Sequence, residues 1–342
     1  MGDLTVVIPT RNRPENISVI LSQLSDEICH RYRIVIVDNS VGELQRLRVQ
    51  RLVESSSKSV EYFQSPANLD MSDNWEFAVS LVETPWVVLM TDRFLPSKGS
   101  FERLEKALDR AELLNLPLIA WHTKSRFNAI RDTEEVSGIM NSREVLNSWL
   151  QFDVKKLNLY ENMLPRFLNC AVHRSLVTAQ KQKFGKLFQP YAPDYTFAAS
   201  MAASNQEYLF LGDVFFESFG RESNGAAVGF NIDLFDFSAL RNTHNDLPIN
   251  DSVLKVVLCD ILNIFDQYDR KVEWSPVNAS RFVLLEHTNI FLREKDVRFF
   301  FKHVLRSVWS ALWMEARNHR LPMSIVLIYK IMITRAFDKL RS

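Results

Sequence analysis

The sequence predicts an α/β protein built around a doubly wound sheet. Three apolar runs rich in Val, Ile and Leu, at residues 4–8, 34–37 and 86–90, are short enough to be strands, and each ends in a polar loop. Unbroken β-branched runs of this kind are typical of parallel strands that are buried on both faces. Segments with helical spacing separate the runs, and consecutive α/β units wind into a right-handed sheet.

The other elements follow from periodicity. A helix is expected after Pro14, and another is expected to open at Asp73 with Ser72 as its N-cap. The further strands are expected at residues 60–63, 116–122 and 208–211. The further helices are expected at residues 101–114, from about 141–144, and at 195–203, 253–265, 279–292, 297–313 and 323–340.

Composition excludes several classes of protein. A chain of 342 residues can bury a large core, and its formal net charge of zero argues against a nucleic-acid partner. Cys29, Cys170 and Cys259 are widely spaced, which favours buried thiols in a reducing compartment over a metal site. The sequence shows neither a secretory signal peptide nor an apolar run of about 20 residues, so no transmembrane helix is expected.

Two carboxylates stand where strands end. Asp38 follows the second apolar run directly, and Asp92 follows the third. In open α/β sheets, ligands bind beyond the carboxyl ends of the strands, so both aspartates are candidate binding residues. A carboxylate at Asp38 offers acceptors only, which suits a nucleobase imide or a ribose hydroxyl. The alternative is a turn residue that caps the next helix.

Several stretches together resemble one family. TVVIPTRNRP, IVIVDNS and SPANLDMSDNWEFAV followed by TPWVVLMTDRFLP resemble the nucleotide-binding half of family 2 glycosyltransferases with the GT-A fold, and PYAPDY, YLFLGD and GRESNG fit its later part. The resemblance covers about residues 4–230. It implies a Rossmann-like doubly wound mixed sheet with a nucleotide-sugar-binding half at residues 1–95 and an acceptor-binding and catalytic half at 96–230. Residues 231–342 are expected to form a helical C-terminal region.

The resemblance also implies which residues bind the donor, a nucleotide sugar and preferably a UDP-sugar. These residues are Pro9, Thr10, Arg11, Asp38, Asn74 and Asp92, and Arg93, which departs from the family pattern, joins them because of its charge. Arg11 can also reach a phosphate, because guanidinium groups bind phosphate oxygens bidentately. The alternative is a solvated arginine beside a proline that merely ends the strand. Asn74 lies at a helix start that can orient a diphosphate, whereas its neighbour Trp75 is expected in the core.

The loop after the third run departs from the family. Family members usually carry an Asp-x-Asp motif there that holds Mn²⁺ or Mg²⁺ on the diphosphate, whereas this chain has Thr91-Asp92-Arg93. One carboxylate beside a cation is a poor metal site, since hard cations need several oxygen ligands. Arg93 can instead neutralise the leaving diphosphate directly. The departure leaves metal dependence open, and it also fits a non-catalytic nucleotide-sugar-binding or scaffolding protein.

Asp194 is the candidate catalytic base. The resemblance implies that it deprotonates an acceptor hydroxyl, whose oxygen attacks the anomeric carbon opposite the leaving group and inverts its configuration. The alternative is an ordinary helix N-cap. A loop with Arg221, Ser223 and Asn224 is expected near the phosphates or the acceptor, with a surface turn as the alternative. A nucleotidyltransferase is a third function class, and the Pro-Asp-Tyr segment favours glycosyl transfer over it.

The end of the chain is basic. Residues 293–342 hold eleven Lys or Arg and four Asp or Glu, a net charge of +7, with aromatic residues among them. Such helices can sit on an anionic membrane, which would suit a lipid-linked saccharide acceptor of surface glycan synthesis. The alternative is a packing domain or a homo-oligomer interface. The sequence predicts a cytoplasmic protein, which is peripheral on the inner face of the membrane if its tail binds lipid.

Overall fold

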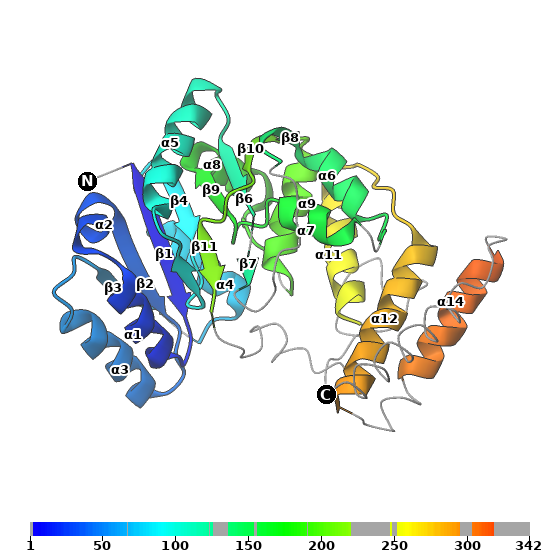
Figure 1. Cartoon of the computed structure of the whole chain (residues 1–342), viewed down its shortest axis with the longest axis horizontal. Coiled ribbons are helices and arrows are strands. Elements are labelled where there is room, and N and C mark those ends of the chain that lie inside the picture. Colours follow the sequence, from blue (N-terminus) through cyan, green and yellow to red (C-terminus); the bar gives the residue numbers. More distant parts are fainter. Residues whose placement is uncertain are drawn as a thin grey trace. The chain divides into compact units, whose positions relative to one another are not determined.

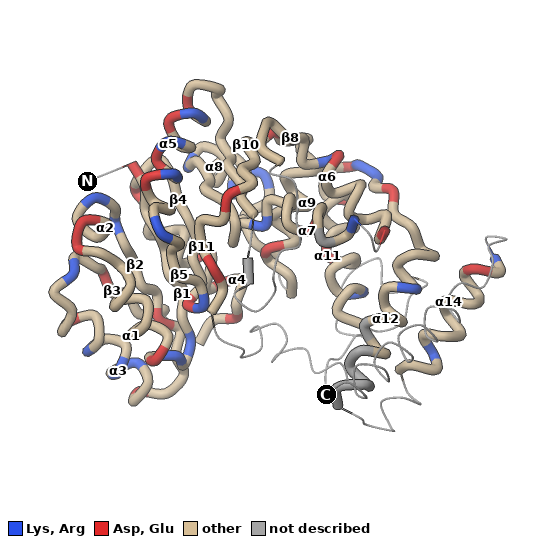
Figure 2. The backbone as a smooth tube through the Cα atoms, in the orientation of Figure 1, with Lys and Arg blue, Asp and Glu red and all other residues tan. Residues whose placement is uncertain are grey.

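The computed structural model describes residues 3–66, 68–122, 124–125, 136–153, 156–189, 191–219, 247, 252–294 and 303–317. The chain forms two compact units, one of Met1–Leu146 with Leu159–Ser223 and one of Asn147–Asn158 with Asn224–Ser342. The boundaries predicted after residues 95 and 230 stay predictions. Figure 1 shows the course of the chain, and Figure 2 shows acidic and basic residues interspersed along the described elements. Within the described ranges, no helix is both long and apolar enough to cross a membrane.

An eight-stranded mixed sheet forms the centre of the first unit. Its strand order is β3-β2-β1-β4-β9-β6-β10-β8. The strands are β1 (Leu4–Thr10), β2 (Arg33–Asp38), β3 (Glu61–Gln64), β4 (Trp86–Leu89), β6 (Leu118–Trp121), β8 (Gly138–Asn141), β9 (Cys170–His173) and β10 (Glu207–Leu211). The first four run parallel, β9 is antiparallel to both β4 and β6, β10 is parallel to β6, and β8 is antiparallel to β10. The predicted mixed, doubly wound sheet is confirmed.

Burial explains why the apolar runs form the central strands. Every residue of β1 and β4 is buried. One face of these strands packs against helices α1 (Pro14–Gln23), α3 (Glu43–Glu54) and α5 (Ser100–Leu113), so alternate residues of each strand enter that core. A second, three-stranded sheet has the order β5-β11-β7, with β5 at Phe94–Pro96, β11 at Phe216–Ser218 and β7 at Lys124–Ser125.

The helices of the first unit begin where the sequence provides a suitable start. They are α1 (Pro14–Gln23), α2 (Asp26–Arg31), α3 (Glu43–Glu54), α4 (Met71–Ser80), α5 (Ser100–Leu113), α6 (Ser142–Trp149), α7 (Leu157–Met163), α8 (Arg174–Phe184) and α9 (Pro193–Ala203). Pro14 and Pro193 each stand in the first turn, where proline costs no hydrogen bond. The cap predicted at Ser72 is wrong. Asp70 caps α4 instead, and its carboxylate accepts the Asp73 N–H at 2.8 Å.

Among the described residues, three helices lie wholly in the second unit, which also includes the end of α6 and the start of α7. The three helices are α11 (Val253–Gln267), α12 (Pro276–Glu294) and α14 (Leu305–Arg317). The helices predicted at residues 253–265 and 279–292 are confirmed, and the one at 323–340 lies outside the described residues. A partly buried ion pair of 2.7 Å between Arg281 and Glu315 joins α14 to α12, and His287 Nδ1 lies 2.7 Å from Ser307 Oγ.

Candidate active site

The predicted binding residues meet at one edge of the sheet. Strands β2, β1 and β4 are parallel neighbours, and Thr10 at the end of β1 lies opposite Asp38 at the end of β2. Asp92 follows β4 after two residues. The side-chain hydroxyl of Thr10 donates to the Asp92 carboxylate at 2.8 Å, which joins the β1 and β4 loops. This edge is where open α/β sheets bind ligands.

Asp38 is completely buried, and protein groups hold both of its carboxylate oxygens. Oδ1 accepts the backbone N–H of Ser40 at 2.9 Å, and Oδ2 accepts the Tyr62 hydroxyl at 3.2 Å. Burial, followed by the Asp38 charge, raises the pKa of Tyr62. The next helix begins at Glu43 with Gly42 at its cap, so the alternative of Asp38 as a helix cap is wrong. A carboxylate has about four lone pairs, which leaves acceptor capacity for a ligand.

Hydrogen bonds join the loops after β1 and β2 into one surface. Asn12, with φ of 57°, accepts the Val41 N–H at 3.0 Å, while its own N–H donates to Ser40 Oγ at 2.8 Å. Arg11 is exposed and its guanidinium donates to Asn68 Oδ1 at 2.8 Å and to the Leu69 carbonyl at 3.3 Å. The exposed guanidinium therefore lies over the segment that leads into α4.

Asn74 belongs to the same region but lies inside the protein. Its Oδ1 accepts the Ser65 hydroxyl at 2.6 Å, and the Ser65 N–H donates to the Asp38 carbonyl at 2.9 Å. Asn74 and Trp75 are both buried at 5% exposure, and Trp75 packs edge-on against Phe188 as predicted for a core residue. Asn74 thus fixes α4 to the end of β2.

Asp92 is buried between two loops. One carboxylate oxygen accepts Thr10 Oγ1 and the other forms an ion pair with Arg13 at 2.9 Å. The Asp92 side chain is 3% exposed and that of Arg13 is 28% exposed. Burial raises the pKa of Asp92 although Arg13, Thr10 and Arg93 oppose the shift. Removing either partner of such a buried pair is costly, because the other charge is left uncompensated.

These residues do not fit a divalent cation. Each Asp92 oxygen already accepts a hydrogen bond, and two guanidinium groups lie near it. Burial and then the Arg13 charge lower the pKa of Arg93, as expected where two cations stand close together. Among the residues that the structure describes, no group of three His, Cys, Asp or Glu side chains could hold a metal ion. A divalent cation here would have few oxygen ligands and would be repelled by both arginines.

Asp194 lies in the first turn of α9. The helix begins at Pro193 with Ala192 at its cap, and no side chain caps it, so the alternative of Asp194 as the N-cap is wrong. Asp194 is partly exposed. Removal from water raises its pKa, the Arg166 guanidinium opposes this shift, and the Glu161 carboxylate adds to it. A carboxylate with a raised pKa is better matched to proton abstraction near neutral pH.

A polar cluster surrounds the start of α9. Arg166 forms an ion pair of 2.7 Å with Glu161, the Tyr195 hydroxyl donates to the same carboxylate, and the Arg166 guanidinium lies 5.6 Å from the centre of the Tyr195 ring. Just before the helix, Tyr191 has a φ of 75°, a region that large side chains rarely adopt. Such backbone strain persists only where surrounding contacts enforce it.

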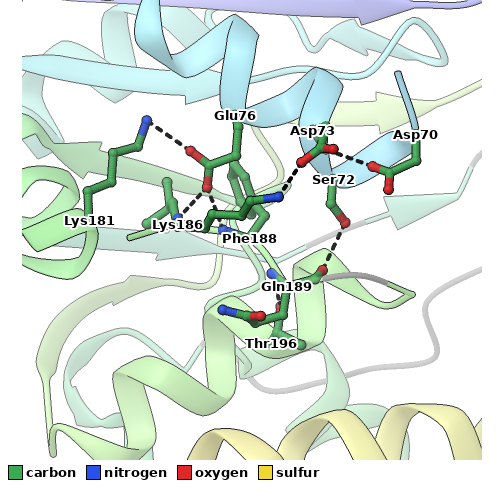
Figure 3. A network of polar contacts seen from close by, with 10 residues as sticks. Asp70, Ser72, Asp73, Glu76, Lys181, Lys186, Phe188, Gln189 and Thr196 are labelled. Atoms are coloured by element: carbon green, nitrogen blue, oxygen red, sulfur yellow. Dashed lines mark hydrogen bonds and ion pairs between the residues drawn. The ribbon is translucent and has the colours of Figure 1, made fainter. Parts of the chain in front are cut away.

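A network of polar contacts connects α4 to the segment before α9 (Figure 3). The Glu76 carboxylate accepts the backbone N–H groups of Leu187 and of Phe188, the latter at 2.7 Å, and pairs with Lys181 at 2.9 Å. Three further contacts lie beside it: Asp73 to Lys186 at 2.6 Å, Ser72 Oγ to the Gln189 carbonyl at 2.8 Å, and the Gln189 N–H to Thr196 Oγ1 at 3.3 Å.

Sequence reasoning missed several of these residues. Arg13 stands in the same loop as Arg11, so the pattern could have nominated it, but only the fold shows that it pairs with Asp92. Tyr62 and Glu161 lie in no motif, and Glu76 lies within the SPANLDMSDNWEFAV stretch but was given no role. Their roles arise from contacts between segments far apart in sequence. The predicted loop residues Arg221, Ser223 and Asn224 lie outside the described residues.

The comparisons with known proteins concern the family and the fold. The sequence profile described as glycosyl transferase family 2 matches residues 5–174. A structure of S. aureus TarS 1–349 in complex with UDP-GlcNAc is similar, with 14% identity, a TM-score of 0.51 and coverage of 91% of this chain and 79% of that chain. The mannosyltransferase PcManGT from Pyrobaculum calidifontis, in complex with GDP-Man and Mn²⁺, has 14% identity, a TM-score of 0.50 and coverage of 97% and 80%. No curated protein sequence matches the chain.

Proposed function

The chain belongs to glycosyl transferase family 2 and has the GT-A fold, and on that premise we propose that it transfers a sugar from a nucleotide-sugar donor to a saccharide or lipid-linked saccharide with inversion at the anomeric carbon. One observation carries the proposal. Thr10, Asp38 and Asp92 meet at the carboxyl edge of three parallel strands, the edge at which open α/β sheets bind ligands. The solved complexes of TarS and PcManGT hold UDP-GlcNAc and GDP-Man, which supports a nucleotide-sugar donor and leaves UDP as our preferred nucleotide.

The donor is proposed to lie across the joined loops after β1, β2 and β4. Asp38 accepts from the base or the ribose with its remaining lone pairs, and Pro9 and Arg11 border the nucleoside. Arg93 and Arg13 face the diphosphate, on which guanidinium groups form bidentate hydrogen bonds. Asn74 acts by holding α4 against the strand end.

The transfer step is proposed to begin at Asp194. Its carboxylate takes the proton of an acceptor hydroxyl, and that oxygen forms a bond to the anomeric carbon. The bond from this carbon to the diphosphate breaks on the opposite face, and its electron pair leaves with the nucleoside diphosphate. The two arginines stabilise the charge that develops there, which is the electrostatic task that a metal performs in other members.

Turnover is therefore expected to survive chelation. Because Arg13 and Thr10 engage Asp92 and Arg93 stands beside it, EDTA should leave at least half of the initial rate. The measurement is donor consumption with EDTA, then with added Mn²⁺ or Mg²⁺. Arg93→Ala should lower the rate about 10²-fold, the order reported for removing one charge-stabilising donor. Activity that disappears in EDTA and returns with Mn²⁺ would refute the arginine role.

The second candidate function is a non-catalytic nucleotide-sugar-binding or scaffolding protein. The replacement of the acidic motif by a paired Asp92 favours it. The test is a calorimetric screen of UDP- and GDP-sugars with and without Mn²⁺, followed by assays of donor hydrolysis and transfer. Transfer to a saccharide establishes the enzyme, whereas tight donor binding without hydrolysis or transfer establishes the binding protein. Failure to bind any nucleotide sugar would contradict both.

The second unit is proposed to place the enzyme on an anionic membrane, on its cytoplasmic side. Leu305, Trp309 and Trp313 follow each other at four-residue spacing on α14, and the tryptophans are 73% and 55% exposed. The opposite side of α14 is buried against α12. Arg317 lies 5.2 Å from the Trp313 ring, and Arg306 is exposed. Exposed tryptophans flanked by arginines match the boundary of anionic lipids, and the +7 charge of residues 293–342 adds attraction.

Binding to vesicles tests this placement. The protein should sediment with vesicles containing anionic phosphatidylserine and should be released by salt, because ions screen exposed charges over about 8–10 Å near physiological ionic strength. A variant with Trp309→Ala and Trp313→Ala should bind severalfold more weakly. Equal binding to neutral vesicles, or binding to neither, would contradict the membrane role, and a dimer in the ultracentrifuge would then assign the face to self-association.

A further inference from the structure

One carboxylate of α4 holds a segment that leads to the proposed base. Glu76 Oε1 accepts two consecutive backbone N–H groups, from Leu187 and Phe188, and Oε2 pairs with Lys181 at 2.9 Å (Figure 3). The Glu76 side chain is only 14% exposed. A carboxylate that accepts two adjacent amides fixes both the position and the orientation of that backbone.

The held segment connects directly to the start of α9. The carbonyl of Gln189 accepts the hydroxyl of Ser72 on α4, and its N–H donates to Thr196 Oγ1. The same Thr196 hydroxyl donates to the Pro193 carbonyl at 3.1 Å. Polar contacts therefore run without a break from α4 to the first turn of α9, where Asp194 lies.

A chain of aromatic contacts runs beside the polar one. Trp75 meets Phe188 at 5.4 Å, Phe188 meets Phe167 at 4.9 Å, and Phe167 meets Phe197 on α9 at 4.8 Å, all edge-to-face. These pairs prefer one mutual geometry. The position of Phe188, which Glu76 holds by its amide, thus also constrains how α9 packs.

The backbone between the two ends needs such support. Tyr191 keeps a left-handed φ of 75°, three residues before Asp194. A tyrosine leaves this region when neighbouring contacts are lost, and the relaxation would turn the chain that enters α9. The contacts of Glu76, Ser72 and Gln189 hold the backbone just before this residue.

We propose that Glu76 is a positioning residue for Asp194, acting through residues 187–189 to set where the base carboxylate meets the acceptor hydroxyl. The proposal rests on the function proposed above. It also gives α4 two roles, because Asn74 holds this helix to the strand end beside Asp38 and Glu76 holds the base segment to the same helix. The donor site and the base are thereby both positioned by the same helix, α4.

Three variants separate this role from simple structural support. Glu76→Ala should lower kcat roughly 10- to 100-fold, the range expected when a catalytic group is displaced by about 1 Å. The Kd for the donor, measured by calorimetry, should change less than twofold. Glu76→Gln keeps an acceptor oxygen for the two amides, so it should restore kcat to within about threefold of wild type. Lys181→Met removes only the ion pair and should also leave kcat within threefold.

Two control variants test whether loss of any ion pair, or of folding, accounts for the fall in kcat. Glu105→Ala, on α5, removes another ion-paired carboxylate, which pairs with the exposed side chain of Arg31, and should leave kcat unchanged. Ser72→Ala is a milder change at the same segment, and a severalfold fall in kcat with an unchanged thermal midpoint supports the proposal even where Glu76→Ala folds poorly. An equal fall in kcat and in the number of donor sites per molecule, measured by the same calorimetry, would instead indicate fewer folded molecules and overturn it.

A double variant distinguishes this proposal from the function on which it rests. If Glu76 acts through Asp194, then Glu76→Ala should lower kcat little further in an Asp194→Asn background. Multiplied losses would show that Glu76 acts elsewhere. An Asp194→Asn variant with full activity would reject the base itself, whereas an active Glu76→Ala beside an inactive Asp194→Asn would reject only the positioning role.

Discussion

Asp194→Asn is expected to lower kcat about 10²- to 10⁴-fold while the donor Kd stays nearly constant. That range is the usual contribution of a general base, and asparagine has similar size but cannot accept the proton. The fold should survive, because Asp194 does not cap α9 and the helix begins with Pro193. The measurement is steady-state transfer to saccharide acceptors, together with donor calorimetry on both proteins.

The pH profile adds a second readout. Burial raises the pKa of Asp194, and the base works only when ionised. The wild-type rate should therefore fall as pH drops through that raised pKa, at a higher pH than for an ordinary aspartate, and Asp194→Asn should lose this acidic limb. Full activity of the variant, with the limb intact, would mean that another carboxylate is the base. The exposed Asp213 and also Glu222, which lies outside the described residues, would then be tested.

Asp38→Ala is expected to weaken nucleotide-sugar binding by about 1–3 kcal/mol. The change leaves polar partners in a buried site unsatisfied, and each such loss costs free energy of that order. Isothermal titration calorimetry with the best donor from the screen gives the value directly. The thermal midpoint of the variant should be measured as well, because the Ser40 N–H and the Tyr62 hydroxyl also lose their acceptor.

Two companion variants separate direct contact from support. Asp38→Asn keeps one acceptor oxygen but presents an NH₂ group to the donor, so it should weaken binding nearly as much as alanine if Asp38 reads the nucleoside. Tyr62→Phe removes the 3.2 Å hydrogen bond without changing the carboxylate and should change the donor Kd less than twofold. Equal losses in Tyr62→Phe and Asp38→Asn would show that Asp38 only arranges the loop.

The central strands could be predicted from the sequence because short apolar runs mark them locally. Short β-branched runs such as residues 34–37 favour buried strands over helices, and β2 ends at Asp38 as predicted. Helix starts were less certain, since several polar residues compete for one cap. Ser72 and Asp70 are both good caps, and only the packing of α4 decides for Asp70, while Ser72 bonds to Gln189 instead.

The active site was predictable in its motifs and unpredictable in its pairings. The motif placed Asp92 at the strand end, but whether it would face a metal or an arginine depends on how the first loop folds over it. Arg13 reaches it across 79 positions of sequence, and Glu76 reaches Phe188 across 112. Such contacts leave no local pattern, because nothing in the neighbourhood of either residue marks its partner.

The strand order also sets the limits within which this protein can be divided. The family profile ends at residue 174, yet β10, at residues 207–211, lies between β6 and β8 in the sheet. A chain ended at residue 174 would leave the edge of β6 without its hydrogen-bonding neighbour and would uncover Trp75 where Phe188 packs. Exposed strand edges promote aggregation. The residues that the family profile matches are thus fewer than the residues that must be expressed together for the sheet to fold.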